Sequence, residues 1–377
     1  MIDHIRLRNF KCFRDETIRF GGLTVLSGLN GAGKSSVIQG LLALRQRWGP
    51  KPGSPWRGSL VNLGPFRDVL HSDAPEDTVR LEASFFGGKG KARLEERPQQ
   101  QGGKRDSTGC DAGAGQWLQG DVFYLSADRL GPRHTLPYLE EGHTSATPLG
   151  TRGEHVLWYL DRFGHSAIHR RIRHHSEPKN TLAAQTSAWL NVISPGAELQ
   201  IKVIPEADRA VASFRYARPD DVPTSPFRAG NVGFGVSYGL PPIVALLAPK
   251  RASQGSVDHL VIIENPEAHL HPAGQTSLAD LASRAVMSGT QVILETHSDH
   301  VLNGVRLAVR DGNLAPDQVA VHYFEREGLD VQVTTPALSS NGQLDVWPEG
   351  FFDQHERNLS RLIGLAAPAG DPPQASR

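Results

Sequence analysis

The stretch GLNGAGKSS, residues 28–36, constrains the fold of this chain more than any other feature. It follows the apolar run LTVLS and precedes VIQGLLALRQ, so a short strand, a glycine-rich turn and a helix are expected in that order. Gly28, Gly33, Lys34 and Ser35 fit the spacing G-x-x-x-x-G-K-S/T, which is typical of a loop that wraps phosphate groups. An ordinary glycine-rich turn is the alternative, but the spacing, the Lys-Ser pair and both flanks favour the phosphate loop.

The residue types in this loop explain how it would hold a nucleotide. Glycine permits backbone angles that are closed to other residues, and the amide groups at a helix start point toward an anion. Lys34 is expected to reach the β- and γ-phosphates, and the Ser35 hydroxyl to ligate Mg²⁺. The expected nucleotide contacts in the loop are Asn30, Gly31, Ala32, Gly33, Lys34, Ser35 and Ser36.

An acidic segment, HLVIIENPEAHLHP at residues 259–272, complements the loop. An apolar strand that ends in carboxylates brings a Mg²⁺-binding residue to the sheet edge beside a phosphate loop. We expect Glu264 in this metal-side position. His297 follows the next apolar strand, where an imidazole can hydrogen-bond the γ-phosphate or the attacking water. A histidine after a strand is more often structural, but the order of the motifs favours a catalytic role.

The segment NVGFGVSYGLPPIVALL, residues 231–247, leads from a glycine-rich turn into an apolar helix. Such a turn is a second place where helix amides can bind an anion. The pattern alone is weak, and its position shortly before the acidic strand strengthens it. We therefore expect Ser237 and Gly239 to contact a nucleotide.

The chain carries four features in a fixed order: the phosphate loop, the Ser-Gly turn, the acidic strand and the histidine. This arrangement resembles the ABC-type ATPase heads of the RecF, SMC and OLD-like predicted prokaryotic ATPases. The opening IRLRNFKCF and the segment ENPEAHLHP are similar to a subgroup with a short C-terminal domain of unknown function, which WPEGFFDQHERNLSRLI at 347–363 resembles. The resemblance implies a head that binds ATP and Mg²⁺ and forms a homodimer. It makes Ser237 and Gly239 the signature residues and His297 the switch histidine.

Two positions depart from the family pattern. Most ABC heads have Asp-Glu where this chain has Glu264-Asn265, and an amide cannot accept a proton from the attacking water. Glu267, three positions on, is the candidate catalytic replacement, and an ordinary surface glutamate is the equal alternative. No glutamine loop occurs in NLGPFRDVLHSD, residues 62–73, where Asp68 or a backbone group would have to substitute.

Hydrophobic periodicity predicts an α/β fold. From residue 257 onward, apolar strands alternate with amphipathic helices, which indicates a mostly parallel sheet flanked by helices. With the resemblance, this predicts a P-loop NTPase: an ABC ATPase-like head with a mixed sheet and a mainly helical insertion. The expected divisions are an N-terminal lobe at 1–150 with a mobile loop at 87–116, the insertion at 151–230, a C-terminal lobe at 231–345, a short C-terminal domain at 346–364 and a disordered tail at 365–377.

Composition limits the partners. Lys plus Arg and Asp plus Glu each number 40, so no global basic excess indicates nucleic acid. The cluster IHRRIRHHSEPK, residues 168–179, leaves a nucleic-acid contact open against the commoner solvated helix face. Two cysteines, a charged N-terminus and the lack of a bilayer-spanning apolar run predict a soluble cytoplasmic protein with no membrane partner.

The expected function is an ATPase whose nucleotide state switches a dimer between open and closed forms. Through the resemblance alone, it would regulate a separate nuclease or toxin-like effector in antiphage defence or DNA maintenance and repair. The alternative is a nucleotide-gated scaffold that binds ATP with little or no hydrolysis, and Asn265 is its motivation. A long-armed SMC protein is disfavoured because sustained heptads are missing.

Overall fold

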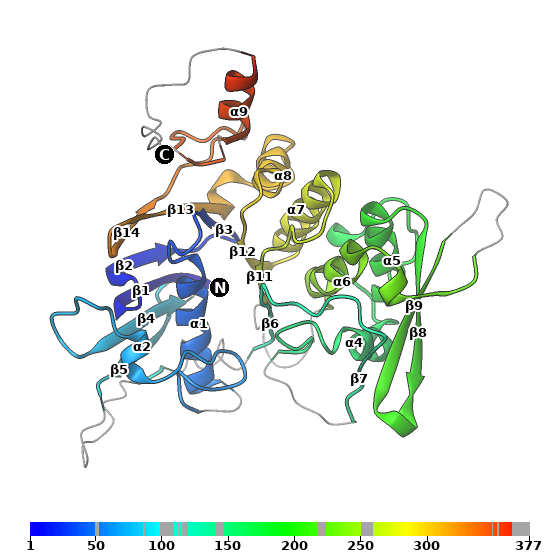
Figure 1. The fold of residues 1–377 in the computed structure, drawn as a ribbon, viewed down its shortest axis with the longest axis horizontal. Coiled ribbons are helices and arrows are strands. Elements are labelled where there is room, and N and C mark those ends of the chain that lie inside the picture. The colour runs from blue at the N-terminus through cyan, green and yellow to red at the C-terminus, as the bar shows by residue number, and fades with distance from the viewer. Residues whose placement is uncertain are drawn as a thin grey trace, which may run out of the picture.

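The computed structural model describes residues 1–49, 53–85, 87–98, 109–111, 113–114, 120–140, 147–216, 224–249, 259–348, 350–352 and 354–363. Within these residues the strands form three sheets, and helices cover both faces of the largest one (Figure 1). No helix in this described part is long and apolar enough to cross a membrane.

The largest sheet carries the strand that precedes the phosphate loop. Its strand order is β14-β13-β3-β12-β11-β6, and every neighbouring pair is parallel except the hairpin of β13 and β14. The bounds are β3 Leu23–Gly28, β6 Val122–Leu125, β11 His259–Glu264, β12 Thr290–Glu295, β13 Val319–Glu327 and β14 Asp330–Thr334. The mixed, mostly parallel sheet expected from the sequence is confirmed.

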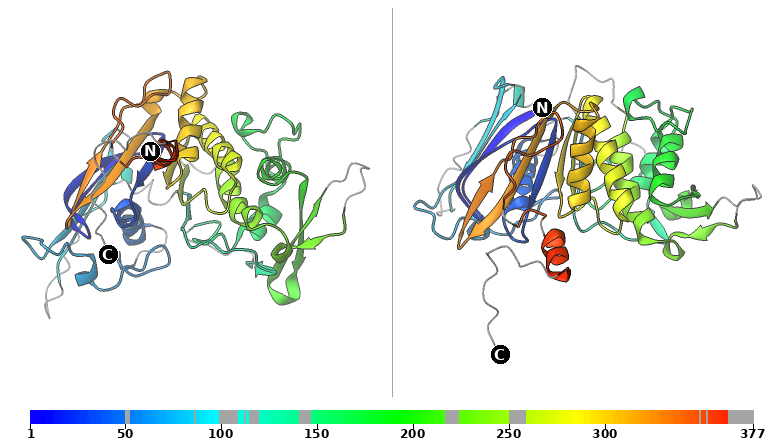
Figure 2. Two further views of the ribbon diagram at one scale, coloured as in Figure 1. Left: turned by 45° about the horizontal axis from the view of Figure 1, so that its top comes forward. Right: turned by 90° about the horizontal axis from the view of Figure 1, so that it is seen from above.

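Helices pack on both faces of this sheet because its central strands are apolar on both sides, with β11 and β12 buried throughout. Val261 and Val292 belong to one hydrophobic core, whereas Ile262 and Ile293 belong to a second core on the opposite face. The helix on the second face is α1 Lys34–Trp48, and those on the first face are α6 Phe234–Leu247, α7 Pro272–Met287 and α8 Asp299–Arg310 (Figures 1 and 2).

An antiparallel sheet in the order β2-β1-β4-β5 shares the second core with α1. Its strands are β1 Ile2–Phe10, β2 Phe13–Arg19, β4 Val79–Phe85 and β5 Gly90–Glu96. Since β5 lies within residues 87–116, the prediction of a mobile loop there is wrong for this strand. A strand on a half-exposed sheet needs apolar side chains only at alternate positions, and buried Ala92 and Leu94 supply them. Residues 99–108, 112 and 115–116 of that segment lie outside the described residues.

The α-helices of the segment 151–230 lie in its first part and strands follow them, so the expected mainly helical insertion also contains part of an antiparallel sheet. Its helices are α4 Val156–Phe163, η1 Arg170–Ile172, α5 Leu182–Ile193, η2 Pro205–Ala207 and η3 Ala229–Asn231. Strands β8 Ala197–Ile204, β9 Arg209–Tyr216 and β10 Phe227–Arg228 join β7 Thr135–Pro137 in an antiparallel sheet. The hairpin of β8 and β9 has alternating apolar and polar residues, which favours a half-buried sheet over a helix.

Short elements complete the described fold. They are α2 Phe66–Val69, η4 Pro316–Gln318 and α9 Gln354–Leu362. Helix α9 lies at the periphery, away from the helices that cover the large sheet (Figure 2). The tail at 365–377, predicted to be disordered, lies outside the described residues.

Candidate nucleotide-binding site

An open cavity of about 580 Å³ lies at the carboxyl ends of the parallel strands. This edge is where open α/β sheets bind ligands, and the volume lies in the range of small-molecule sites. Eight residues predicted from the sequence line it together: Asn30, Gly31, Gly33, Lys34, Ser35, Ser36, Glu264 and His297. The fold therefore brings the loop, the acidic strand and the histidine to one place.

The phosphate loop needs glycine at two positions where the backbone has positive φ. Gly28 has φ 136°, and a Cβ there would lie 2.2 Å from the carbonyl oxygen of Phe324. Gly33 has φ 104°, and its Cβ would lie 2.8 Å from the Sγ of Cys12. Ala32, also predicted as a contact, is fully buried beneath the loop.

Lys34 is buried at the base of the loop. Its Nζ donates hydrogen bonds to the carbonyl oxygens of Gly28 at 2.9 Å and Leu29 at 2.8 Å. Burial lowers the pKa of Lys34, and the nearby carboxylates of Glu295 and Glu267 oppose that shift. An ammonium group has three hydrogens to donate, so two hold the loop in shape and the third is available for a phosphate.

Glu295, the last residue of β12, is a site residue that the sequence analysis missed. The Ser35 hydroxyl donates to its Oε1 at 2.9 Å. Burial and, next, the carboxylate of Glu264 raise the pKa of Glu295 to about 7. The signal was present, because Glu295 ends an apolar strand just as Glu264 does and stands two residues before His297.

Glu264 is buried at the end of β11. Its Oε1 accepts a hydrogen bond from the Tyr124 hydroxyl at 2.9 Å, and its Oε2 accepts one from the backbone amide of Ala127 at 3.2 Å. Burial raises the pKa of Glu264, and these hydrogen bonds oppose the rise. Asn265 follows with φ 45°, a region that asparagine tolerates better than most residues, and it also lines the cavity.

Glu267 and His297 lie together. The Glu267 carboxylate accepts hydrogen bonds from the Thr296 hydroxyl at 2.7 Å and the His297 backbone amide at 2.8 Å. The side chain of His297 is exposed at the cavity, and partial burial and Lys34 lower its pKa, which favours the neutral imidazole. Glu267 is half-buried with a fixed orientation rather than a free surface glutamate, and its catalytic role stays a prediction.

Ser237 and Gly239 lie inside α6 and not in a turn. The helix begins at Phe234, so these residues occupy its second turn. Ser237 lines a separate, mostly apolar cavity, and a Cβ on Gly239 would lie 2.9 Å from the side chain of Ile193. Prolines at 241 and 242 favour a helix start close to them, but here both lie in the helix interior.

Other residues that line the cavity come from loops, and the positions of these loops depend on how the six-stranded sheet packs against the β2-β1-β4-β5 sheet. Lys11 and Cys12 of the β1–β2 turn line the cavity, and Lys11 Nζ donates to the side-chain oxygen of Gln39 at 2.5 Å. In residues 62–73, where a glutamine loop was sought, Asp68 is exposed and pairs with Arg67. Within the same segment, residues 71 and 72 line the cavity instead of Asp68.

Buried Arg129 connects the acidic strand end to α6. Its guanidinium donates to the backbone carbonyl oxygens of Ser126, Glu264 and Asn265. It also lies 5.8 Å from the ring centre of Tyr238 on α6. No pattern in the sequence pointed to this residue.

Family comparison decides the class of the chain. Residues 23–303 match a family model described as "AAA domain, putative AbiEii toxin, Type IV TA system". The chain belongs to this AAA family. Residues 314–362 of the AAA protein match a second model, a protein of unknown function (DUF3696), so the matched region begins well before residue 346, where the short C-terminal domain was expected to start. No curated protein matches the chain.

Solved structures show the fold of the AAA protein. An SMC head bound to the C-terminal winged-helix domain of ScpA has a TM-score of 0.53 and 14% identity, over 89% of this chain and 98% of that one. An Smc head from Pyrococcus furiosus with an extended coiled coil, bound to the C-terminal domain of ScpA, has a TM-score of 0.51 and 12% identity, over 96% and 99%. The predicted P-loop ATPase head fold is therefore confirmed.

Proposed function

We propose that this AAA protein binds and hydrolyses ATP with Mg²⁺, and that the nucleotide state switches a homodimer between open and closed forms. The observation that carries the proposal is the single cavity in which Lys34, Ser35, Glu264 and His297 lie together. The cavity fits the nucleotide because the loop, shaped by glycines with positive φ, places the start of α1 at the cavity, and because Lys34 keeps a hydrogen for an anion.

Each residue then has a role. Lys34 and the loop amides hold the phosphates, and Ser35 with Glu264 holds Mg²⁺, which neutralises phosphate charge when bound. Glu267 orients the attacking water, supported by the two hydrogen bonds that fix its carboxylate. His297 contacts the γ-phosphate from the cavity wall.

The alternative function is a scaffold that binds ATP with little or no hydrolysis. Asn265 favours it, since this residue cannot accept a proton. Steady-state phosphate release with Mg²⁺ separates the two functions. Turnover that Lys34→Ala abolishes, and that Glu267→Gln slows without weakening ATP binding, supports the enzyme. Tight ATP binding without turnover supports the scaffold.

The start of α6 is the surface that we propose closes on the ATP of a second subunit. The first amides of a helix favour a polyanion, and Gly233 and Phe234 are exposed there. A two-fold axis would place each helix start over the opposite phosphate loop and form two equivalent sites. Ser237 and Gly239, the signature residues implied by the resemblance, then support the helix from within its second turn.

Mixing two inactive variants tests the composite site. A Cβ at Gly233 meets no atom within 4 Å, so Gly233→Arg places bulk at the surface without disturbing the core. Gly233→Arg and Lys34→Ala should each lack turnover, and an equal mixture should regain about a quarter of the wild-type rate, since half of the dimers carry one intact site. Gly53→Arg, at another open glycine, is the matched control. Full turnover by Gly233→Arg alone would reject the dimer site.

The nucleotide-switched dimer would act through a separate effector. A nuclease or toxin-like partner in antiphage defence or DNA maintenance, with nucleic acid as a further candidate ligand, is supported by the sequence resemblance and by the toxin named in the family description. Co-purification with the product of a neighbouring gene, compared between wild type and Lys34→Ala in the presence of ATP, tests it. ATP-dependent capture by the wild type alone is the expected result.

A further inference from the structure

Glu295 has one carboxylate oxygen in use and one without a partner. The residue is only 5% exposed. Its Oε1 accepts the Ser35 hydroxyl, whereas its Oε2 is buried and has no hydrogen-bond partner in the described part of the chain. A buried polar atom without a partner is costly, and natural proteins keep few of them without a function.

The sheet order explains why this oxygen lies where it does. Strand β12 lies between β3, which leads into the phosphate loop, and β11, which ends in Glu264. In the parallel ladders Glu295 pairs in register with Leu26 on one side and with Glu264 on the other. Both carboxylates line the same cavity, so Glu295 stands between the phosphate loop and Glu264.

The carboxylates of Glu264 and Glu295 differ in their hydrogen-bond partners. Both oxygens of Glu264 already accept hydrogen bonds, from Tyr124 and Ala127. The unpartnered oxygen belongs to Glu295, the residue that also holds the Ser35 hydroxyl. Two buried like charges on adjacent strands repel each other, and a cation that both of them face removes that repulsion.

We propose that Glu295 is an acidic ligand of the Mg²⁺ ion that accompanies the nucleotide, beside Ser35, and that Glu264 acts on the same ion from the neighbouring strand. This inference rests on the proposed nucleotide function. Hard oxygen donors suit Mg²⁺ or Mn²⁺, and Mg²⁺ is typically held by one or two carboxylates together with phosphate oxygens and water. Accordingly, the described residues contain no group of three or more His, Cys, Asp or Glu side chains that could hold a metal by themselves.

Mn²⁺ binding to the full chain, followed by electron paramagnetic resonance in the presence of ADP, tests the role of Glu295. Glu295→Gln should weaken Mn²⁺ binding about tenfold or more, since it removes the charge and keeps an acceptor for Ser35. Glu82→Gln, which removes a carboxylate on the outer face of the antiparallel sheet, should bind Mn²⁺ as the wild type does. Equal or tighter Mn²⁺ binding by Glu295→Gln overturns the proposal.

A second variant separates a metal ligand from a structural acceptor. Glu295→Asp keeps the charge on a shorter side chain, so it should retain more Mn²⁺ affinity than Glu295→Gln, whereas a structural acceptor for Ser35 would give the reverse order. Thermal unfolding without metal checks that both variants fold.

Binding of a fluorescent ADP analogue in EDTA is measured first. If the wild type binds no nucleotide there or with Mn²⁺, the proposed function fails. If nucleotide binds normally and the Mn²⁺ affinity of Glu295→Gln is unchanged, only the role of Glu295 fails.

Discussion

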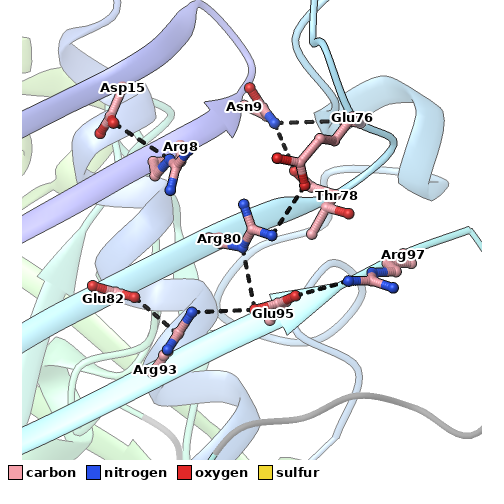
Figure 3. Close-up of polar contacts among 10 residues, drawn as sticks. All are labelled: Arg8, Asn9, Asp15, Glu76, Thr78, Arg80, Glu82, Arg93, Glu95 and Arg97. Carbon is pink, nitrogen blue, oxygen red and sulfur yellow. Dashed lines mark hydrogen bonds and ion pairs between the residues drawn. The ribbon is translucent and has the colours of Figure 1, made fainter.

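Two glutamates near the ends of their strands, Glu95 in β5 and Glu295 in β12, are 9% and 5% exposed but have opposite surroundings. Glu95 pairs with Arg80, Arg93 and Arg97 at 3.2 to 3.3 Å, as Figure 3 shows. Burial alone would raise the pKa of Glu95, but these arginines lower it overall. Glu295 instead faces a second carboxylate, and its pKa is raised.

The comparison of Glu95 with Glu295 shows where the chain pairs its buried carboxylates with its own arginines and where it does not. The outer face of the antiparallel sheet is a lattice of ion pairs that also includes Arg8 with Asp15 and Arg93 with Glu82 (Figure 3). Such charges need no further partner. At the edge of the large sheet, buried acids lie beside one another, and buried groups with shifted pKa values gather at functional sites. A buried carboxylate whose charge the chain leaves unbalanced therefore indicates the site, whereas a charged side chain with a partner does not.

Removing the buried cation of the site should have the largest effect. Lys34→Ala deletes the ammonium group that has a hydrogen left for a phosphate, and a charge-assisted hydrogen bond contributes roughly 1.5 to 3 kcal/mol. ATP affinity should therefore fall by about tenfold to a hundredfold in titrations with a fluorescent analogue. Lys91→Ala, at an exposed position of β5, should bind ATP as the wild type does, and equal affinity of the two variants would show that Lys34 does not face the phosphates.

Removing the buried arginine behind the site should have a smaller effect, on stability. Arg129→Met leaves three backbone carbonyl oxygens without their donor and should lower the free energy of unfolding by about 2 kcal/mol in urea denaturation. Arg152→Met is the control, because Arg152 also donates to a carbonyl oxygen but its side chain is 44% exposed. A loss no greater than that of the control would contradict the bridging role of Arg129.

Replacing Glu95, whose charge is balanced by arginines, should have the smallest effect on stability, and that effect should depend on pH. Glu95→Gln should lower the free energy of unfolding at pH 7 by about 1 kcal/mol or less, since its ion pairs are partly solvated. The folded pKa of Glu95 lies below the ordinary value of 4.5, so this stability is present above pH 4.5 and is lost as the pH falls through the folded pKa. Urea denaturation at a series of pH values falling from pH 7 checks it, and a difference that does not shrink as the pH falls would assign the effect to packing.

The sequence predicted those parts of the fold and site that depend on local pattern. The phosphate loop, the acidic strand and the alternating strands and helices after residue 257 are each visible in a short window, because their periodicity and spacing are local. Strand β5 was missed since its glycine-rich surroundings concealed its alternation. The start of α6 was misplaced because two prolines lie in the helix interior, where tertiary packing outweighs propensity.

Other site residues depend on contacts between segments far apart in the chain. Lys11 and Arg129 reach the site only after the sheets have packed, and neither has a spacing motif. Glu295 is different, since the rule that identified Glu264 applied to it equally. Sheet order, which the sequence does not reveal, is what puts Glu295 next to the loop.

Arg129 makes contact with both the end of β11 and helix α6. Its guanidinium is hydrogen-bonded to the end of β11, and its flat face lies over an aromatic ring of α6. The hydrogen bonds hold Arg129 to the strand end, and its contact with α6 is the one with the Tyr238 ring. Arg129 is therefore a physical contact between the acidic strand end, which lines the cavity, and the helix whose start is exposed. A change at the cavity that moves the end of β11 would also change this contact of α6.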